Sequence, residues 1–132
     1  MKRLAAAVVA VAVLALIPAA LAAGTLSGKY KEVIKNDHAE GGHLNGTWVL
    51  DFTKGKYAAS DNGHPVVHGA DSIKGDKITF QPGKGMDKCP APGTYKFKLS
   101  GSKLTFTVVS DSNPKCAGRR DVLTHGPFTK VG

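Results

Sequence analysis

Five histidines are the side chains of this sequence best suited to metal or haem chemistry: His38, His43, His64, His68 and His125. His64 and His68 stand four residues apart in an extended segment, so they would lie on one face of a strand. Together with His38 or His43 they would supply imidazole ligands. A metal site needs several converging ligands, however, and no second ligand motif accompanies these residues. We therefore expect surface histidines, no metal site and no cofactor.

The residues that could catalyse hydrolysis stand in no supporting motif. The serines have no Gly-x-Ser-x-Gly context, the turn that presents a nucleophile at a strand end. Carboxylate pairs such as Asp37 with Glu40 and Asp71 with Asp76 stand in expected turns, where Asp usually bonds the backbone. No phosphate-binding loop is present in the sequence. Because no group of residues meets the outline of a catalytic site, we expect that the protein is not an enzyme.

Cys89 and Cys116 are the only cysteines, and neither stands in a C-x-x-C motif, so a structural zinc site is not indicated. An isolated pair in an exported chain most often forms one disulfide. Closing a loop of this length would stabilise the fold by about 3 to 4 kcal/mol in the chain-entropy model. Two free or metal-binding thiols are the alternative.

The first 22 residues have the pattern of a signal peptide. Lys2 and Arg3 precede an unbroken apolar run over residues 4–17, and Pro18 interrupts the run. Small residues then stand at the spacing that a signal peptidase reads, so we expect cleavage after Ala22. An uncleaved membrane anchor is the alternative, because the apolar run approaches the length that spans a bilayer. The leader predicts a secreted or extracytoplasmic protein, in the periplasm or cell envelope, that meets the membrane only before cleavage.

The remaining chain is basic but carries no concentrated basic patch. The whole sequence has 18 Lys and Arg against 10 Asp and Glu, and removal of Lys2 and Arg3 leaves a formal net charge of +6. Most lysines alternate with apolar residues along expected strands. Nucleic-acid binding needs clustered positive charge, so we expect a solvated basic surface and no nucleic-acid partner.

Alternation of apolar and polar residues predicts strands along almost all of the chain after the leader. The clearest pair is "TYKFKLS" and "KLTFTVV", with Tyr95, Phe97, Leu99 and then Leu104, Phe106 and Val108 facing inward. Gly and Asp, Asn or Ser mark turns between them. We also expect strands over residues 28–34, 47–52, 56–60, 64–74, 77–80, 119–125 and 127–131. Helical periodicity appears nowhere outside the leader.

Eight or nine short strands joined by hairpins favour one all-β domain. One-sided alternation indicates an antiparallel sheet with one buried face, and closure into a barrel removes the exposed edges. A two-layer sandwich would need longer crossovers. We therefore predict a single antiparallel up-and-down barrel of about eight strands. Its expected organisation is a signal peptide over residues 1–22, an N-terminal strand and loop over 23–45, and the barrel over 46–132, which forms one domain with 28–34.

Trp48, the only tryptophan, opens a strand in "GTW". This resembles the Gly-x-Trp motif of the lipocalins and the wider calycin group, in which the Trp lies across the closed end of the barrel under a basic residue from near the last strand. The series "GTW", "F…G.Y", "G.KITF" and "GTYKF.L.G.KLTF", followed by Asp, Cys and Arg, resembles small exported bacterial lipocalin-like proteins across residues 46–128. The resemblance implies that Arg119 or Arg120 packs on Trp48 as a cation–π partner. Lipocalins usually carry a helix packed on the barrel, for which this chain is expected to have no room.

Two hypotheses for function follow. In the first, the barrel binds a hydrophobic or amphipathic small molecule, lined by the inward residues Trp48, Leu50, Tyr95, Phe97, Leu104 and Phe106. In the second, large side chains fill the barrel, and its surface contacts another protein or the cell envelope, for example as an inhibitor. Eight strands enclose an interior only just wide enough for side chains, so the free volume inside the barrel decides between them.

Overall fold

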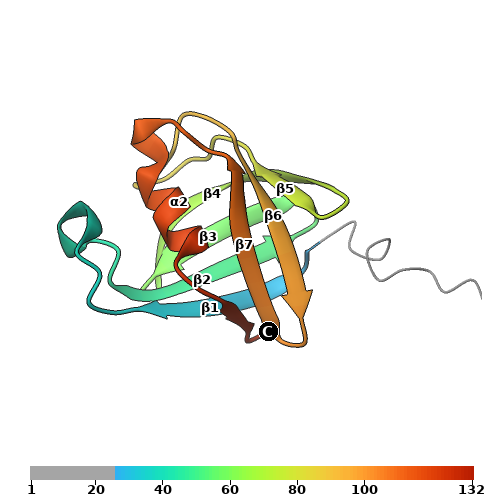
Figure 1. Cartoon of the computed structure of the whole chain (residues 1–132), viewed down its shortest axis with the longest axis horizontal. Helices are drawn as coiled ribbons and strands as arrows, with labels where there is room; N and C mark the ends of the chain where they lie inside the picture. The colour runs from blue at the N-terminus through green and yellow to red at the C-terminus, as the bar shows by residue number, and fades with distance from the viewer. Residues whose placement is uncertain (1–25) are drawn as a thin grey trace, which may run out of the picture.

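The computed structural model describes residues 26–132, and the predicted signal peptide lies outside these described residues. Eight antiparallel strands close into a barrel, each hydrogen-bonded to the next in the chain and β8 to β1 (Figure 1). The predicted all-β up-and-down barrel is therefore confirmed. The strands are β1 (Gly28–Ile34), β2 (Gly46–Thr53), β3 (Lys56–Asp61), β4 (His64–Lys74), β5 (Lys77–Phe80), β6 (Gly93–Ser100), β7 (Lys103–Ser110) and β8 (Phe128–Lys130).

Tight hairpins join most neighbouring strands, as the turn residues predicted. At Lys54-Gly55 and Asn62-Gly63 both central residues have positive φ, 49° and 75° in the first turn and 50° and 82° in the second. This is the type I′ geometry, whose twist matches that of the paired strands. Longer connections carry a 3₁₀ turn, η1 (Ala39–Gly42), between β1 and β2, and an irregular loop, residues 81–92, between β5 and β6.

Period-two alternation correctly gives the buried face along most strands, with two exceptions. Trp48, Leu50 and Phe52 are buried on β2, as are Tyr95 and Phe97 on β6 and Leu104 and Phe106 on β7. Leu99 and Val108, which were also expected inside, are 44% and 42% exposed. The ladder between β5 and β6 ends at Lys96, and β8 pairs with β7 only at Lys103 and Leu104. Both exposed side chains therefore lie where one neighbouring strand is absent.

The predicted strand over residues 119–125 is wrong, because this segment is helical. The 3₁₀ turn η2 (Pro114–Cys116) leads into α2 (Ala117–Thr124), which lies along β7 (Figure 1). Val122 and Leu123 are both buried. Adjacent residues of a strand point to opposite faces, whereas a helix can turn both toward the barrel. The chain therefore does have room for a helix on its barrel, because β8 contains three residues and α2 covers the wall beside it.

An aromatic cluster fills one half of the barrel interior. Phe80 is its centre, with ring centroids 5.1 Å from Tyr57, 5.9 Å from Tyr95 and 6.1 Å from Phe106. Most pairs meet edge to face, the geometry that aligns the positive ring edge with the negative ring face. The remaining members, which extend the cluster to β1, β2 and β8, are Tyr30, Phe52 and Phe128.

Replacing Phe80 with Ala should lower the free energy of unfolding by about 3 to 5 kcal/mol, because it removes a buried ring and leaves a cavity among its neighbours. Urea unfolding followed by circular dichroism measures this loss. The control is Val109→Ala, since Val109 is 51% exposed, and it should change stability by less than about 0.5 kcal/mol. A Phe80→Ala loss no larger than that of the control would contradict the central role of Phe80.

Candidate binding cavity

A cavity of about 500 Å³ occupies the other half of the barrel, beside η1, the β5–β6 loop and α2. Its wall begins on the strands with Trp48 and Leu50 from β2, continues through β3 and β4, and reaches Phe80 at the edge of the aromatic cluster. The helix side contributes Val122 and Leu123. Other lining residues are Glu40, His43, Leu44, Tyr57, Ala59, Asp61, Val66, Val67, Met86, Asp87, Lys88, Cys89, Lys115, Cys116, Gly118 and Arg119.

Two of the six predicted pocket residues, Trp48 and Leu50, line this cavity. The other four, Tyr95, Phe97, Leu104 and Phe106, are buried on β6 and β7 but are not among its lining residues. Sequence reasoning missed the contribution of β3, where Tyr57, Ala59 and Asp61 alternate along the inner face. The pairing of β3 with β2 could have identified these residues, since Ala59 lies opposite Leu50 and Asp61 lies opposite Trp48. It also missed the residues contributed by η1 and α2.

Trp48 is 5% exposed and lies in the cavity wall. Its indole Nε1 donates a hydrogen bond of 2.7 Å to the carbonyl oxygen of Leu44, in the loop before β2. The bond satisfies the one polar atom of the ring and fixes the ring's orientation. Trp48 thereby ties the β1–β2 loop to the barrel and also contributes ring surface to the cavity.

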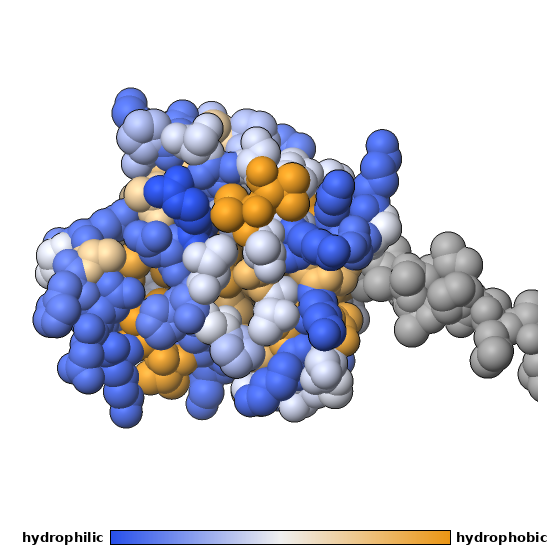
Figure 2. Space-filling view, viewed as in Figure 1, coloured by the Kyte–Doolittle hydropathy of each residue, from blue (hydrophilic) through white to orange (hydrophobic). Residues whose placement is uncertain are grey.

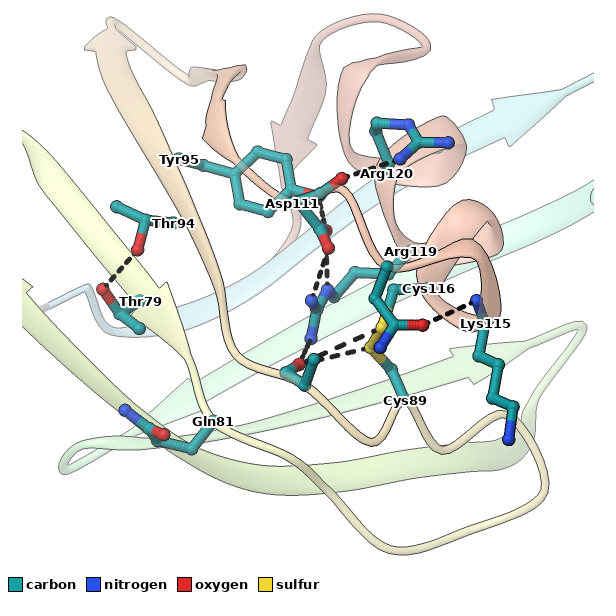
Figure 3. Close-up of polar contacts among 12 residues, drawn as sticks. Thr79, Gln81, Cys89, Thr94, Tyr95, Asp111, Lys115, Cys116, Arg119 and Arg120 are labelled. Carbon is teal, nitrogen blue, oxygen red and sulfur yellow. Dashed lines mark hydrogen bonds and ion pairs between the residues drawn. A yellow bond between two sulfur atoms is a disulfide. The ribbon is translucent and has the colours of Figure 1, made fainter.

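The Asp111 carboxylate, at the end of β7, accepts hydrogen bonds from two parts of the chain, α2 and β6 (Figure 3). Arg119 of α2 donates to it from Nε at 2.9 Å and from Nη2 at 2.7 Å, and Tyr95 of β6 donates from its hydroxyl. The Asp111 side chain has no exposed surface and that of Arg119 is 12% exposed. Burial raises the pKa of Tyr95, and the hydrogen bond to Asp111 raises it further. The Tyr95 hydroxyl therefore stays protonated as a donor.

Both candidate arginines are engaged in this network. The Nη1 of Arg119 donates to the carbonyl oxygen of Ala91 at 2.9 Å, and that of Arg120 to the carbonyl oxygen of Asp111 at 2.7 Å. Both residues belong to α2 rather than to a strand. Arg119 lines the same cavity as Trp48, and its stacking on the indole stays a prediction.

The disulfide Cys89–Cys116 is present, as the isolated cysteine pair predicted. It joins the β5–β6 loop to the beginning of α2, and both residues line the cavity. The Asp111 network lies close by, since the β5–β6 loop also supplies the Ala91 carbonyl (Figure 3). Two independent links therefore hold the loop against the helix. All five histidines are exposed; His43 lies at the cavity, and His64 and His68 lie on β4.

Glu32 is the most deeply buried carboxyl group on the β1 side of the barrel. Its side chain is 4% exposed, and Oε1 lies 3.7 Å from Nδ1 of His125, at the end of α2. Among the described residues no donor meets full hydrogen-bond geometry at either carboxyl oxygen, and the backbone N–H of Gly126 is the donor near the group. Burial raises the pKa of Glu32 to about 8, an effect that the Gly126 backbone N–H opposes. Glu32 is therefore largely protonated at neutral pH.

No protein-family model, curated protein or solved structure matches the chain. The closed barrel of eight antiparallel strands is consistent with a calycin-like fold. Within residues 26–132, no helix is long and apolar enough to cross a membrane. Hydrophilic residues cover most of the face in Figure 2, interrupted by smaller hydrophobic areas.

Replacing Asp111 with Asn should lower the free energy of unfolding by about 3 to 5 kcal/mol, because the buried guanidinium of Arg119 loses its charged partner. Urea unfolding measures the change. Asp76→Asn is the matched control, since Asp76 forms an exposed ion pair with Lys96 at 3.5 Å, and exposed pairs contribute about 1 kcal/mol or less. Equal effects of the two substitutions would contradict the structural role of Asp111.

Wild-type stability should contain a component that falls as pH rises from about 4.5 to about 8, because folding holds Glu32 protonated over this range while the unfolded chain releases the proton. Glu32→Gln removes this titration. The stability of the variant relative to wild type should therefore increase between pH 5 and about pH 8 and level off above that, in urea unfolding at each pH. Glu40→Gln, at the exposed glutamate of η1, is the control and should show a constant difference. A constant difference for Glu32→Gln as well would contradict the raised pKa.

Proposed function

We propose that this protein is an exported, lipocalin-like binding protein that holds an apolar or amphipathic small molecule in the cavity beside Trp48. One observation carries the proposal: the barrel is filled by aromatic rings in one half and hollow in the other. The hollow half, at about 500 Å³, has the size typical of small-molecule sites.

The distribution of polarity in the cavity favours an amphipathic ligand. Its inner wall is apolar, formed by Trp48, Leu50, Ala59 and Phe80 together with the buried helix residues. Exposed charged side chains lie at the rim: Glu40 of η1, Asp87 and Lys88 of the β5–β6 loop, and Lys115 of η2. An apolar body would gain about 25 cal/mol for each Å² removed from water against the inner wall. A polar group at the rim would keep its solvation or find a charged partner.

The lipocalin-like character rests on the Gly-x-Trp motif at the start of β2 and on α2. Gly46 and Trp48 stand at the beginning of the strand that supplies the cavity wall. A helix before the last strand, which the sequence did not predict, brings the chain closer to the lipocalin pattern of a barrel with a packed helix. The signal-peptide pattern of residues 1–22 and the disulfide support export to an oxidising compartment. In this proposal the protein is neither an enzyme nor a nucleic-acid-binding protein, and it uses no cofactor.

A second candidate function is action through the outer surface, as an inhibitor or a cell-envelope interaction protein. The observation that favours it is the exposure of large apolar side chains, among them Val33 of β1 and Val109 of β7, which are 46% and 51% exposed. The aromatic half of the barrel gives this surface a rigid support. The two candidates differ in whether a small molecule enters the barrel.

Filling the cavity with a larger side chain should abolish small-molecule binding. Ala59 lines the cavity and Ala58, its neighbour on β3, does not, so Ala59→Phe and Ala58→Phe form a matched pair. We expect the neutral fluorescent probe N-phenyl-1-naphthylamine to bind the wild type and Ala58→Phe, and to bind Ala59→Phe at least about tenfold more weakly because of lost volume. Probe fluorescence measures binding, and thermal unfolding checks that both variants fold. Equal binding by the two variants, or none by the wild type, would favour the surface function.

A further inference from the structure

Neighbouring strands bring Glu32, Trp48 and Asp61 into one row inside the barrel. Glu32 of β1 lies opposite Trp48 of β2, and Trp48 lies opposite Asp61 of β3. Side chains at directly opposed positions share a face of the sheet and touch or nearly touch. Among the described residues, the buried side-chain oxygen and nitrogen atoms without a hydrogen bond are both carboxyl oxygens of Glu32 and Oδ1 of Asp61. The indole thus lies between two carboxyl groups, and Asp61 has one buried oxygen, Oδ1, without a hydrogen bond.

Asp61 is the member of this pair that lines the cavity. The backbone of Gly46 lies directly against Oδ1 of Asp61, so this oxygen is closed off from the cavity. Oδ2 is not among the buried unbonded atoms, and it is the oxygen left for a ligand in the cavity. Burial raises the pKa of Asp61, the charge of Asp87 raises it further, and His64 opposes the rise. A positive group placed in the cavity would relieve this cost of desolvation.

The cationic side chains that line the cavity form no ion pair with Asp61. The guanidinium of Arg119 is bound by Asp111 and by the Ala91 carbonyl oxygen. Lys88 and Lys115 are exposed at the rim, and no ion pair of Asp61 is formed among residues 26–132. Three carboxylates line the cavity: Glu40, Asp61 and Asp87. Glu40 and Asp87 are exposed, whereas Asp61 is partly buried beside the apolar wall, where His64 lies opposite it in register.

Trp48 supplies the second half of a cation site. Its Nε1 is occupied by the Leu44 carbonyl, so the ring presents carbon surface to the cavity. An indole attracts a cation to its face through the ring quadrupole, and the carboxylate opposite it in register adds a charge-assisted hydrogen bond. We propose that the cavity selects an organic cation, a protonated amine carried on an apolar body, with Asp61 as its ionic partner and Trp48 as the surface against which it packs. This inference rests on the proposed small-molecule binding function.

Three probes of equal chain length test the charge preference: 1-aminooctane, 1-octanol and octanoate, titrated at pH 7 and low ionic strength into the disulfide-bonded protein. Trp48 is the only tryptophan, so its fluorescence reports on the cavity, and calorimetry gives the dissociation constants. We expect the wild type to bind the amine at least about tenfold more tightly than the alcohol, and octanoate most weakly. Salt should weaken amine binding and leave alcohol binding unchanged.

Asp61→Asn should reduce amine affinity by about tenfold and leave alcohol affinity unchanged, because the substitution removes the charge and keeps the shape. Asp51→Asn is the matched control. It removes the same charge from the neighbouring strand β2, at a position that does not line the cavity, and it should bind all three probes as the wild type does. Thermal unfolding of both variants confirms folding.

The remaining outcomes reject either the cation site or the binding function. Equal binding of amine and alcohol, or an amine preference that survives Asp61→Asn, rejects the cation site and leaves the small-molecule function standing. Tighter binding of octanoate also rejects it and assigns the polar end of the ligand to Lys88, Lys115 and Arg119. Failure of all three probes, together with N-phenyl-1-naphthylamine, rejects the binding function itself.

Discussion

The buried Asp111 carboxylate is the interaction on which the hollow half of the barrel depends. The last strand contains three residues and closes the barrel at one end, beside the aromatic cluster. Toward the other end, α2 and the β5–β6 loop must take the place of a longer strand. Arg119 joins both segments to Asp111 at the end of β7, and Tyr95 anchors the same carboxylate to β6. The disulfide adds a covalent link between the same loop and helix.

The division of the interior follows from the sizes and positions of the inward residues. Phe80 stands at the boundary, because it contacts the aromatic rings on one side and lines the cavity on the other. On the cavity side of Phe80, the inward side chains of β3 and β4 include Ala59 and Val66. These side chains are smaller than the aromatic ones of β6 and β7, and they leave the space of the cavity. A barrel of eight strands can thus be both a packed core and a container, at different heights along one axis.

Much of the fold was predictable, because a strand with one buried face alternates apolar and polar residues, and this alternation can be seen in the sequence. The hairpin of β6 and β7 is the clearest case, with regular alternation and a Gly-Ser turn. The helix was not predictable in the same way. Helical periodicity is recognised over a window of about 11 to 18 residues, whereas α2 has eight residues, of which only Val122 and Leu123 are buried. For the cavity, period two gives the face of a residue but not its height in the barrel. Trp48 and Tyr95 therefore looked equivalent in the sequence, although only Trp48 lies at the cavity.

The uninterrupted pairing of each strand with its sequence neighbour also has a consequence for how the chain acquires its fold. Seven of the eight strand pairings are between consecutive strands, and the eighth joins β1 to β8 through Tyr30 and Lys31. Each tight hairpin closes a short loop at small entropic expense, whereas joining the two ends of the chain requires nearly its whole length to be ordered. The hairpins can therefore form from contacts that are local in the sequence. The pairing of β1 with β8, which closes the barrel, is the one strand pairing between distant parts of the chain.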